Sequence, residues 1–183
     1  AGIRDVSNLA WKISHCLKNK HNDKLLNTYQ SERFSNVKEY IETTMRMGEF
    51  VNAIGKSPIT NNISADSKGR QSMKSIQPRL GKGLGEVKDK NRGKIFPQFI
   101  KSNKKLDVKF SLKPILITSG EIKKNISLNI NLISSKNIKN LEYFFKNHNC
   151  KAVIVRPDRF ILSSCASVKN FNSYLNKNLS LLA

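Results

Sequence analysis

The sequence predicts an α/β fold, in which a helical hairpin is followed by a small α/β domain. Three observations lead to this prediction. Apolar residues recur at helical spacing through residues 2–54, whereas short apolar runs typical of strands occur only beyond residue 105. A stretch rich in glycine and polar residues lies between the two regions and indicates a domain boundary there. The length of 183 residues suits one domain or two small ones.

The first helix is predicted over residues 2–17. At about 100° per residue, one arc of this helix gathers Ile3, Val6, Leu9, Ala10, Ile13, Cys16 and Leu17. We expect this arc to face the core. The other side carries Trp11 together with Arg4, Asn8, Lys12 and His15. A large aromatic side chain on that side indicates a helix that needs contact on both sides, inside a multi-layer protein.

A polar connection leads to a second, longer helix, with Asn22 or Asp23 available as its N-cap. Its pattern keeps a spacing of three to four residues through Leu26, Tyr29, Arg33, Val37, Tyr40, Ile41, Thr44, Gly48 and Val51. Gly55 and Pro58 follow, as expected just past a helix end. The two helices are expected to form a hairpin with a shared core. We expect Tyr29, Glu32 and Arg33 to make buried contacts between them.

From residue 57 to 94 the periodicity stops, and glycine, asparagine and serine predominate. The stretch is too long for an ordinary loop, so we predict a linker or a surface arm. Its Gly-Lys-Gly-Leu-Gly run at residues 81–85 is not interpreted as a phosphate loop. No strand precedes the run, and no helix or Gly-Lys-Ser/Thr follows it.

The remaining residues are expected to form the α/β domain. Strands are predicted at residues 106–112, 115–118, 126–132, 152–155 and 160–163. Helices are predicted from residue 138 to an end near residues 147–149, and over residues 168–179. The turn at Arg156-Pro157-Asp158-Arg159 contains a proline that presets φ. We expect this turn to be structural, with Arg156 and Asp158 bridging to the domain that contains the first two helices or to a second subunit.

Composition narrows the function classes. The net charge of +20 invites a nucleic-acid interpretation, but lysines are scattered along the whole chain and arginine is scarce, whereas base reading favours Arg. We therefore interpret the charge as a solvated surface. The three cysteines, Cys16, Cys150 and Cys165, lack CxxC or metal-ligand spacing, which favours a reducing, cytoplasmic setting. No leader or membrane-spanning run is recognised. The histidines His15, His21 and His148 have no carboxylate at a fixed spacing, and no catalytic or metal role is assigned to them.

The residues Gly2-Ile3-Arg4-Asp5-x-x-Asn8-Leu9-Ala10-Trp11-Lys12 resemble the last FAD-binding motif of the single-component FAD-dependent aromatic hydroxylases. The branch in question contains the 3-(3-hydroxyphenyl)propionate and phenol hydroxylases. Three further stretches resemble later parts of that family in the same order: residues 25–33, 95–98 and 153–160. The Gly-x-Gly-x-x-Gly motif and the Gly-Asp pair of the family are absent from the sequence. The resemblance is therefore to the C-terminal part of such an enzyme.

This resemblance implies a division into three parts. Residues 1–56 would be the C-terminal helices of an FAD-binding domain, residues 57–94 a linker or surface arm, and residues 95–183 a thioredoxin-like domain. That domain has Thr118-Ser119-Gly120-Glu121 in place of CxxC, so it is expected to do no dithiol chemistry.

For the chemistry, the resemblance implies that NAD(P)H reduces FAD and that the reduced flavin uses O₂ to hydroxylate an aromatic, phenolic substrate. The cofactor-binding residues would be Gly2, Ile3 and Asp5, at the positive end of the first helix. For Asp5, a plain carboxylate at a helix start is an equal alternative. Arg4 and Asn8 would hold a loop near the cofactor or simply cap the helix, and a structural role is favoured.

A homodimer through the C-terminal domain is also implied. No catalytic residue and no metal ligand is assigned, and the chain alone is expected neither to hold FAD tightly nor to hydroxylate. The alternative function is a small basic binding protein that keeps a degenerate hydroxylase scaffold and binds anionic partners.

Overall fold

The computed structural model describes residues 2–18, 23–54, 76–101, 104–106, 112–120, 130–135, 138–167 and 171–179. Two helices, α1 (Gly2–Lys18) and α2 (Asp23–Ile54), come first. Two short strands, β1 (Ile100–Lys101) and β2 (Lys104–Lys105), form a small antiparallel pair. Next come β3 (Ile115–Thr118), β4 (Asn131–Ser134), α3 (Leu141–Asn147), β5 (Ala152–Val155), β6 (Ile161–Cys165) and α4 (Phe171–Leu179). The result is a mixed α/β fold, as predicted.

The four-stranded sheet has the order β4-β3-β5-β6. β3 runs parallel to β4 and antiparallel to β5, and β5 runs antiparallel to β6. The central strands β3 and β5 are buried at every position, which explains why their sequences are continuous apolar runs rather than alternating ones.

Each face of the sheet has its own core. One face presents Ile115, Ile117, Val153 and Val155 to α3 and to the segment that carries Phe96 and Phe99. The other face presents Leu116, Ala152 and Ile154 to Trp11 of α1, Leu25 of α2 and Leu175 of α4. Because side chains alternate along a strand, neighbouring residues of β3 and β5 enter opposite cores. Trp11 and Leu25 thus bring the helix pair onto the sheet.

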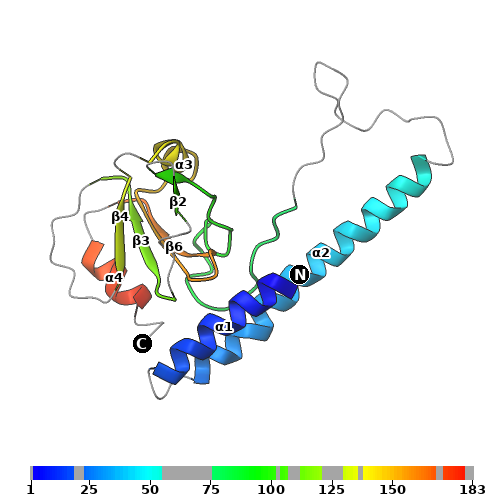
Figure 1. Ribbon diagram of the computed structural model, residues 1–183, viewed down its shortest axis with the longest axis horizontal. Coiled ribbons are helices and arrows are strands. Elements are labelled where there is room, and N and C mark those ends of the chain that lie inside the picture. Colours follow the sequence, from blue (N-terminus) through cyan, green and yellow to red (C-terminus); the bar gives the residue numbers. More distant parts are fainter. Residues whose placement is uncertain are drawn as a thin grey trace.

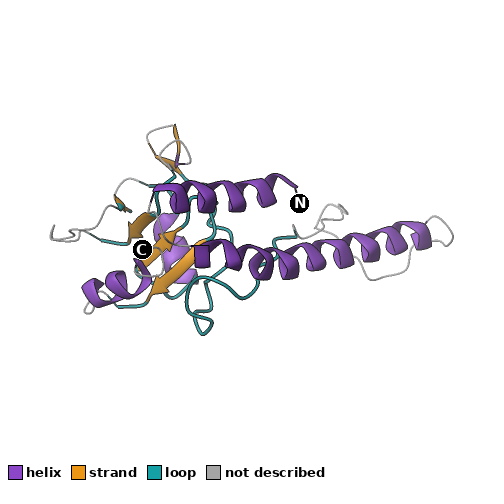
Figure 2. Ribbon diagram, turned by 90° about the horizontal axis from the view of Figure 1, so that it is seen from below, coloured by secondary structure: helices purple, strands orange, loops and turns teal. Residues whose placement is uncertain are grey.

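Helices α1 and α2 lie side by side, and the second half of α2 projects well beyond the sheet (Figure 1). In the view from below, α1 and α2 extend to the right beyond the strands of the sheet, and α4 lies on the left (Figure 2). The distal part of α2 exposes Ile41, Met45 and Val51.

The predicted inward face of α1 is wrong. Ile3 and Leu17 are 87% and 77% exposed, and Val6 and Ile13 are exposed as well. The buried residues of α1 are instead Asn8, Trp11 and Lys12, from the side that was expected to be polar. The physical reason is a buried network of charged groups, described below, that Asn8 and Lys12 complete. We expected both sides of α1 to be in contact with other elements; in the structure the side with Asn8, Trp11 and Lys12 is buried, whereas Ile3, Val6, Ile13 and Leu17 on the other side are exposed.

Several strand and helix bounds differ from the predictions. β4 begins at Asn131 rather than residue 126, and residues 121–129 lie outside the described part. Leu106 follows β2 and is not in a strand, while residues 107–111 are not described. α3 begins at Leu141 because Ile138 forms an isolated bridge with Lys101. α4 is described from Phe171, and Gly55 and Pro58 lie outside the described residues.

The described part of the predicted linker, residues 76–94, lies against α2 and β6. Gly81 N–H donates to the carbonyl oxygen of Glu32 over 2.9 Å, and Gly93 N–H donates to that of Ile161 over 2.8 Å. An added Cβ at Gly81 would overlap the Ser31 carbonyl oxygen, and one at Gly83 would overlap the Glu32 side chain. The glycine run therefore allows a close approach of two backbones. Whether residues 57–94 separate two domains stays a prediction.

This close approach predicts that Gly83→Ala destabilises the fold. Glu32 is fully buried and held by several donors, so it has no room to yield to a methyl group. We expect the free energy of unfolding in urea to fall by roughly 1–3 kcal/mol. Gly48→Ala is the control, since Gly48 lies in α2 with open space around it and should gain up to about 1 kcal/mol. Equal stability of Gly83→Ala and the unsubstituted protein would contradict the account.

Candidate functional site

Glu32 of α2 is a fully buried carboxylate surrounded by N–H donors from three other elements. Its Oε1 accepts from Arg156 Nη1 at 2.8 Å and from the Leu84 backbone N–H at 3.0 Å. Its Oε2 accepts from Lys12 Nζ at 2.9 Å, Arg156 Nη2 at 2.9 Å and Asn8 Nδ2 at 3.2 Å. One carboxylate thus joins α1, the loop around residue 84 and the turn after β5.

The turn between β5 and β6 supplies the principal partner of Glu32. Arg156 binds the Glu32 carboxylate with both terminal nitrogens, the paired geometry that suits guanidinium and carboxylate. Asp158 accepts from Arg156 Nε at 3.0 Å and Nη2 at 2.6 Å. Asp158 also accepts from Asn8 Nδ2 at 2.8 Å. Arg156 therefore bridges to α2 and Asp158 to α1, which agrees with the first of the two alternatives expected for this turn.

The network, defined as Lys12, Glu32, Arg156 and Asp158 with Asn8, contains two positive and two negative charges. Burial alone would raise the pKa of Glu32, but Arg156 and Lys12 outweigh it and lower the pKa to about 2. Burial lowers the pKa of Lys12, and Glu32 partly offsets that effect. Burial would likewise lower the pKa of Arg156, but Asp158 and Glu32 raise it. The groups therefore hold one another in their charged forms.

Trp11 packs directly on this network. The Arg156 guanidinium lies over the indole ring, 5.1 Å from its centroid, and Trp11 is 2% exposed. His15 lies edge-to-face with the indole, at 6.4 Å between ring centroids. Trp11 is the single tryptophan of the chain, so its fluorescence reports the contact between α1 and the sheet.

A second polar cluster ties the start of α1 to α2. Arg33 Nε donates to Asp5 Oδ1 at 2.6 Å, and Arg33 Nη1 donates to Asn36 Oδ1 at 2.5 Å. Asn36 Nδ2 in turn donates to the carbonyl oxygen of Pro78 at 2.6 Å. One residue earlier in α1, Arg4 Nη1 donates to the Tyr40 hydroxyl, and its guanidinium lies over the Tyr40 ring. Arg33 thus pairs with Asp5 across the two helices, as Glu32 pairs with Lys12.

The predicted cofactor-binding residues are only partly brought together. Asp5 lines an open groove of about 770 Å³ along α2, whose other walls include Tyr29, Phe34 and Ile41. Gly2 has open space around it and Ile3 is exposed, and neither lines the groove. Arg4 and Asn8 make structural contacts, the role favoured for them, but they do not cap the helix: Arg4 binds Tyr40, and Asn8 binds Glu32 and Asp158.

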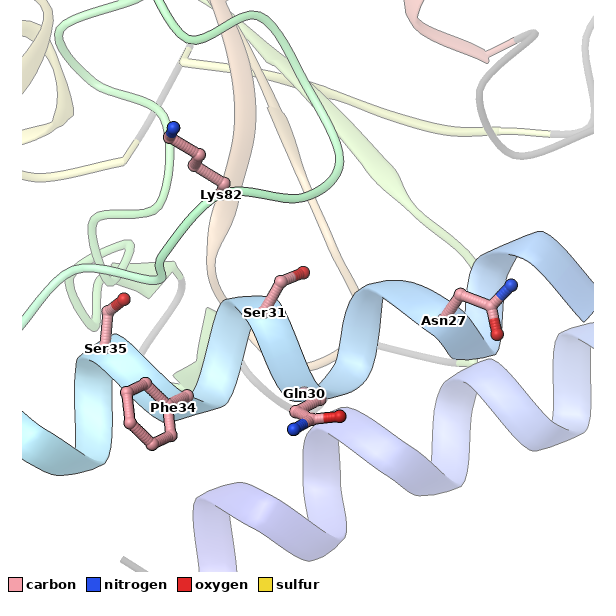
Figure 3. Close-up of a pocket in the computed structure, with 6 residues that line it drawn as sticks. All are labelled: Asn27, Gln30, Ser31, Phe34, Ser35 and Lys82. Carbon is pink, nitrogen blue, oxygen red and sulfur yellow. The ribbon is translucent and has the colours of Figure 1, made fainter.

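A second groove, of about 530 Å³, runs along the other flank of α2. Its walls are Asn27, Gln30, Ser31, Phe34, Ser35 and Lys82. Figure 3 shows five of these residues on successive turns of α2 and Lys82 on the loop that carries Gly81 and Gly83, with its side chain directed away from the helix. The lining consists of amides, hydroxyls, one phenyl ring and one amine, and it includes no acid–base or nucleophile–base pair.

The remaining residues that could carry chemistry, Cys150 and His148, are engaged in packing within the fold. Cys150 is a free thiol whose pKa is raised to about 11, mainly by burial, so it is a poor nucleophile. His148 packs on the Phe144 ring, with its Nδ1 3.0 Å from the Phe144 carbonyl oxygen. Among the residues that the structure describes, no group of His, Cys, Asp and Glu is arranged to hold a metal ion. His21 is not among them.

Sequence reasoning missed the partners of Glu32. Lys12 and Asn8 stand one helical turn apart on α1, and this spacing is the one local signal that both point the same way. Leu84 donates through its backbone, which leaves no mark in the sequence.

No described helix is long and apolar enough to cross a membrane.

Comparison with known proteins gives concordant matches. Residues 1–44 match the family described as FAD binding domain. A probable NADH-specific resorcinol 4-hydroxylase from Rhodococcus jostii (strain RHA1) is 34% identical over 102 residues, which cover 54% of this chain and 18% of that protein. A 3-(3-hydroxy-phenyl)propionate/3-hydroxycinnamic acid hydroxylase from Escherichia coli (strain K12 / DH10B) is 42% identical over 48 residues, or 26% of this chain and 9% of that protein.

The solved structure of OxyS anhydrotetracycline hydroxylase from Streptomyces rimosus superposes with a TM-score of 0.51 at 14% identity. The superposition covers 96% of this chain and 39% of that one, so it extends the likeness in fold over nearly all of the present residues. The matched region spans less than a fifth of the curated relatives.

The network predicts that Arg156→Met separates α1 from the sheet. Glu32 would keep only part of its compensating charge, so the free energy of unfolding should fall by about 3–5 kcal/mol. The emission of Trp11 should shift to the red as the indole loses the guanidinium and gains water. Arg159→Met, in the same turn but outside the network, is the matched control. Similar losses in the two variants would contradict the assignment.

The lowered pKa of Glu32 predicts a specific acid sensitivity. Glu32 takes up a proton near pH 4.5 when unfolded and only near pH 2 when folded. Its contribution is therefore complete above pH 4.5 and is lost as the pH falls through 2, by about 3 kcal/mol in all. Urea unfolding at stepped pH should show this loss. Glu32→Gln should be less stable at neutral pH and should decline less steeply on acidification; an unchanged slope would contradict the assignment.

The matches and the geometry lead to one conclusion about kinship: the chain is similar to part of an FAD-dependent aromatic hydroxylase, and residues 1–44 carry its likeness to the FAD-binding domain.

Proposed function

We propose that this chain is the C-terminal part of an FAD-dependent, NAD(P)H-using monooxygenase that hydroxylates an aromatic, phenolic substrate. The carrying observation is the match of residues 1–44 to the FAD binding domain family, which includes the start of α1. The names of the relatives support the reaction class, since they are hydroxylases of resorcinol and of hydroxyphenylpropionate. The name of the Rhodococcus relative supports a nicotinamide as the reductant.

The start of α1 fits a flavin through its backbone rather than through a side chain. N–H groups of the first helical turn lack partners within the helix and carry partial positive charge. Gly2 leaves this backbone open to close approach. Ile3 follows it on the exposed surface, whereas Asp5 is engaged by Arg33 and contributes by fixing the position of the helix start. Bound FAD would supply the chemistry of oxygen activation.

The exposed apolar stripe of α1 supports the placement in a larger domain. A helix whose two faces are both apolar or aromatic needs two packing surfaces, and the sheet supplies one of them. The rest of an FAD-binding domain would supply the other. On this proposal residues 1–56 belong to that domain and residues 57–94 connect it to residues 95–183.

We further propose that residues 95–183 form a thioredoxin-like domain and contribute to a homodimer of the whole enzyme. The support is the sheet order β4-β3-β5-β6, with one parallel and two antiparallel pairs, a helix after β4 and another after β6. Thr118 is the last residue of β3 and Ser119 follows it, at the position where a redox-active domain of this kind would need cysteine.

The proposal predicts that the 183-residue chain purifies without flavin and is inactive alone. The reason is that one helix start offers too few contacts to hold a dinucleotide. Titration of FAD fluorescence should show no saturable binding, and the visible spectrum should lack flavin bands. A yellow protein with stoichiometric FAD would contradict this part. Tight, salt-resistant binding of RNA or DNA would instead favour the basic binding protein.

The proposal also predicts the coding sequence upstream of Ala1. An in-frame Gly-Asp pair should precede it closely, and a Gly-x-Gly-x-x-Gly should lie further upstream. In the protein extended by that sequence, Gly2→Val should lower the flavin content, because a branched side chain blocks the approach to the helix start. Gly48→Val is the matched control, since both glycines have open space around them. Equal flavin content in the two variants would count against the assignment of Gly2.

A further inference from the structure

Arg33 of α2 is a buried cation whose charge is matched at the start of α1. Its Nε donates to Asp5 Oδ1 at 2.6 Å, and Asp5 lies in the first turn of α1. Among the residues that the structure describes, Asp5 is the carboxylate in ion-pair contact with Arg33. A buried guanidinium without an opposite charge is costly. The pair therefore places one positive and one negative charge beside the helix start.

The guanidinium of Arg33 is also fixed from its other side. Its Nη1 donates to Asn36 Oδ1 at 2.5 Å. Asn36 is fully buried, and its Nδ2 donates to the carbonyl oxygens of Pro78 and Arg79 at 2.6 and 3.1 Å. Because of these contacts, the guanidinium cannot turn away from Asp5 without losing its hydrogen bonds to the rest of the fold.

The two members of this pair differ in exposure. The Arg33 side chain is 4% exposed, whereas that of Asp5 is 27% exposed. Both residues line the groove of about 770 Å³ along α2. The more accessible member of the pair is thus the carboxylate, and the enclosed guanidinium compensates its charge.

We propose that Arg33 is a positioning residue for the flavin, which acts by neutralising Asp5 beside the start of α1. This inference rests on the proposed function, in which that helix start directs partial positive charge toward the flavin ring. The reduced ring is anionic near neutral pH, and charges near it tune its reduction. An uncompensated carboxylate in the first turn would oppose reduction. Arg33 cancels that opposition and keeps Asp5 at the helix start.

This role differs in one measurable respect from that of a purely structural salt bridge. Loss of either partner breaks the same link between α1 and α2, so a structural role alone would change the flavin site in the same direction in both variants. The charges that remain after each substitution have opposite signs. An electrostatic role therefore shifts the reduction potential of the flavin in opposite directions.

The test is the reduction potential of FAD in the protein extended by its upstream coding sequence, measured by equilibration with a reference dye. Asp5→Asn leaves the Arg33 charge uncompensated. It should raise the affinity for reduced relative to oxidised flavin at least threefold, which corresponds to a rise of about 14 mV for two electrons. Arg33→Gln leaves the Asp5 charge uncompensated and should lower the potential by a similar amount. Arg33→Lys keeps the positive charge and should largely restore the potential.

Lys38→Gln and Glu42→Gln are the matched controls. These residues of α2 line the same groove and pair at 3.8 Å, but their side chains are 64% and 53% exposed. Since water and salt screen exposed charges, both variants should leave the potential unchanged. Urea unfolding and Trp11 emission show whether each variant folds. If Arg33→Gln does not fold, the comparison of Asp5→Asn with Glu42→Gln decides.

The possible outcomes separate this inference from the proposed function. In an extended protein that holds FAD, the inference would be overturned by shifts in the same direction, by no shift, or by equal shifts in the controls. The proposed function would then still stand. An extended protein that holds no flavin would overturn the proposed function and this inference with it.

Discussion

The burial of Glu32 is the constraint on which the arrangement of this chain depends. An ionised carboxylate without partners is very costly in a protein interior, so each of its oxygens must be matched by donors. The donors come from Asn8 and Lys12 on α1, the Leu84 backbone and Arg156 after β5. The positions of two helices, one loop and one turn are therefore set by a single group. The same requirement explains the glycines beside it, because Gly81 and Gly83 allow the loop to reach Glu32.

The network also explains why α1 turns a polar side inward. A helical periodicity argument considers only the burial of apolar side chains, and on that basis the arc from Ile3 to Leu17 would face the protein core. Lys12 and Asn8 have partners for their charge and polarity on the inner side, and Trp11 adds a large apolar surface beside them. The apolar arc is left for another surface. A pattern along the chain cannot show this, because Glu32 and Arg156 are 124 residues apart.

Local features of the sequence predicted much of the sheet. β3 and β5 are continuous apolar runs because both of their faces are buried, and their bounds agree with the prediction. The turn at Arg156 and Asp158 was recognised from its proline and from its charged pair, and its bridging role follows from having no solvent around it. Of the strand predicted at residues 126–132, residues 126–129 lie outside the described part, and the alternation did not predict that β4 extends to Ser134, the residue that pairs with Thr118 of β3. Of the candidate site, the resemblance singled out Asp5, but only the structure shows that Arg33 engages it.

The central claim is that Glu32 and Arg156 are coupled across the junction of helices and sheet. A double-mutant cycle of Glu32→Gln and Arg156→Met, followed by urea unfolding at neutral pH, measures this coupling most directly. The account predicts that the two losses are far from additive, with a coupling free energy of about 2–3 kcal/mol, because either change alone leaves a buried charge without its partner. Additive losses, with a coupling free energy near zero, would contradict it.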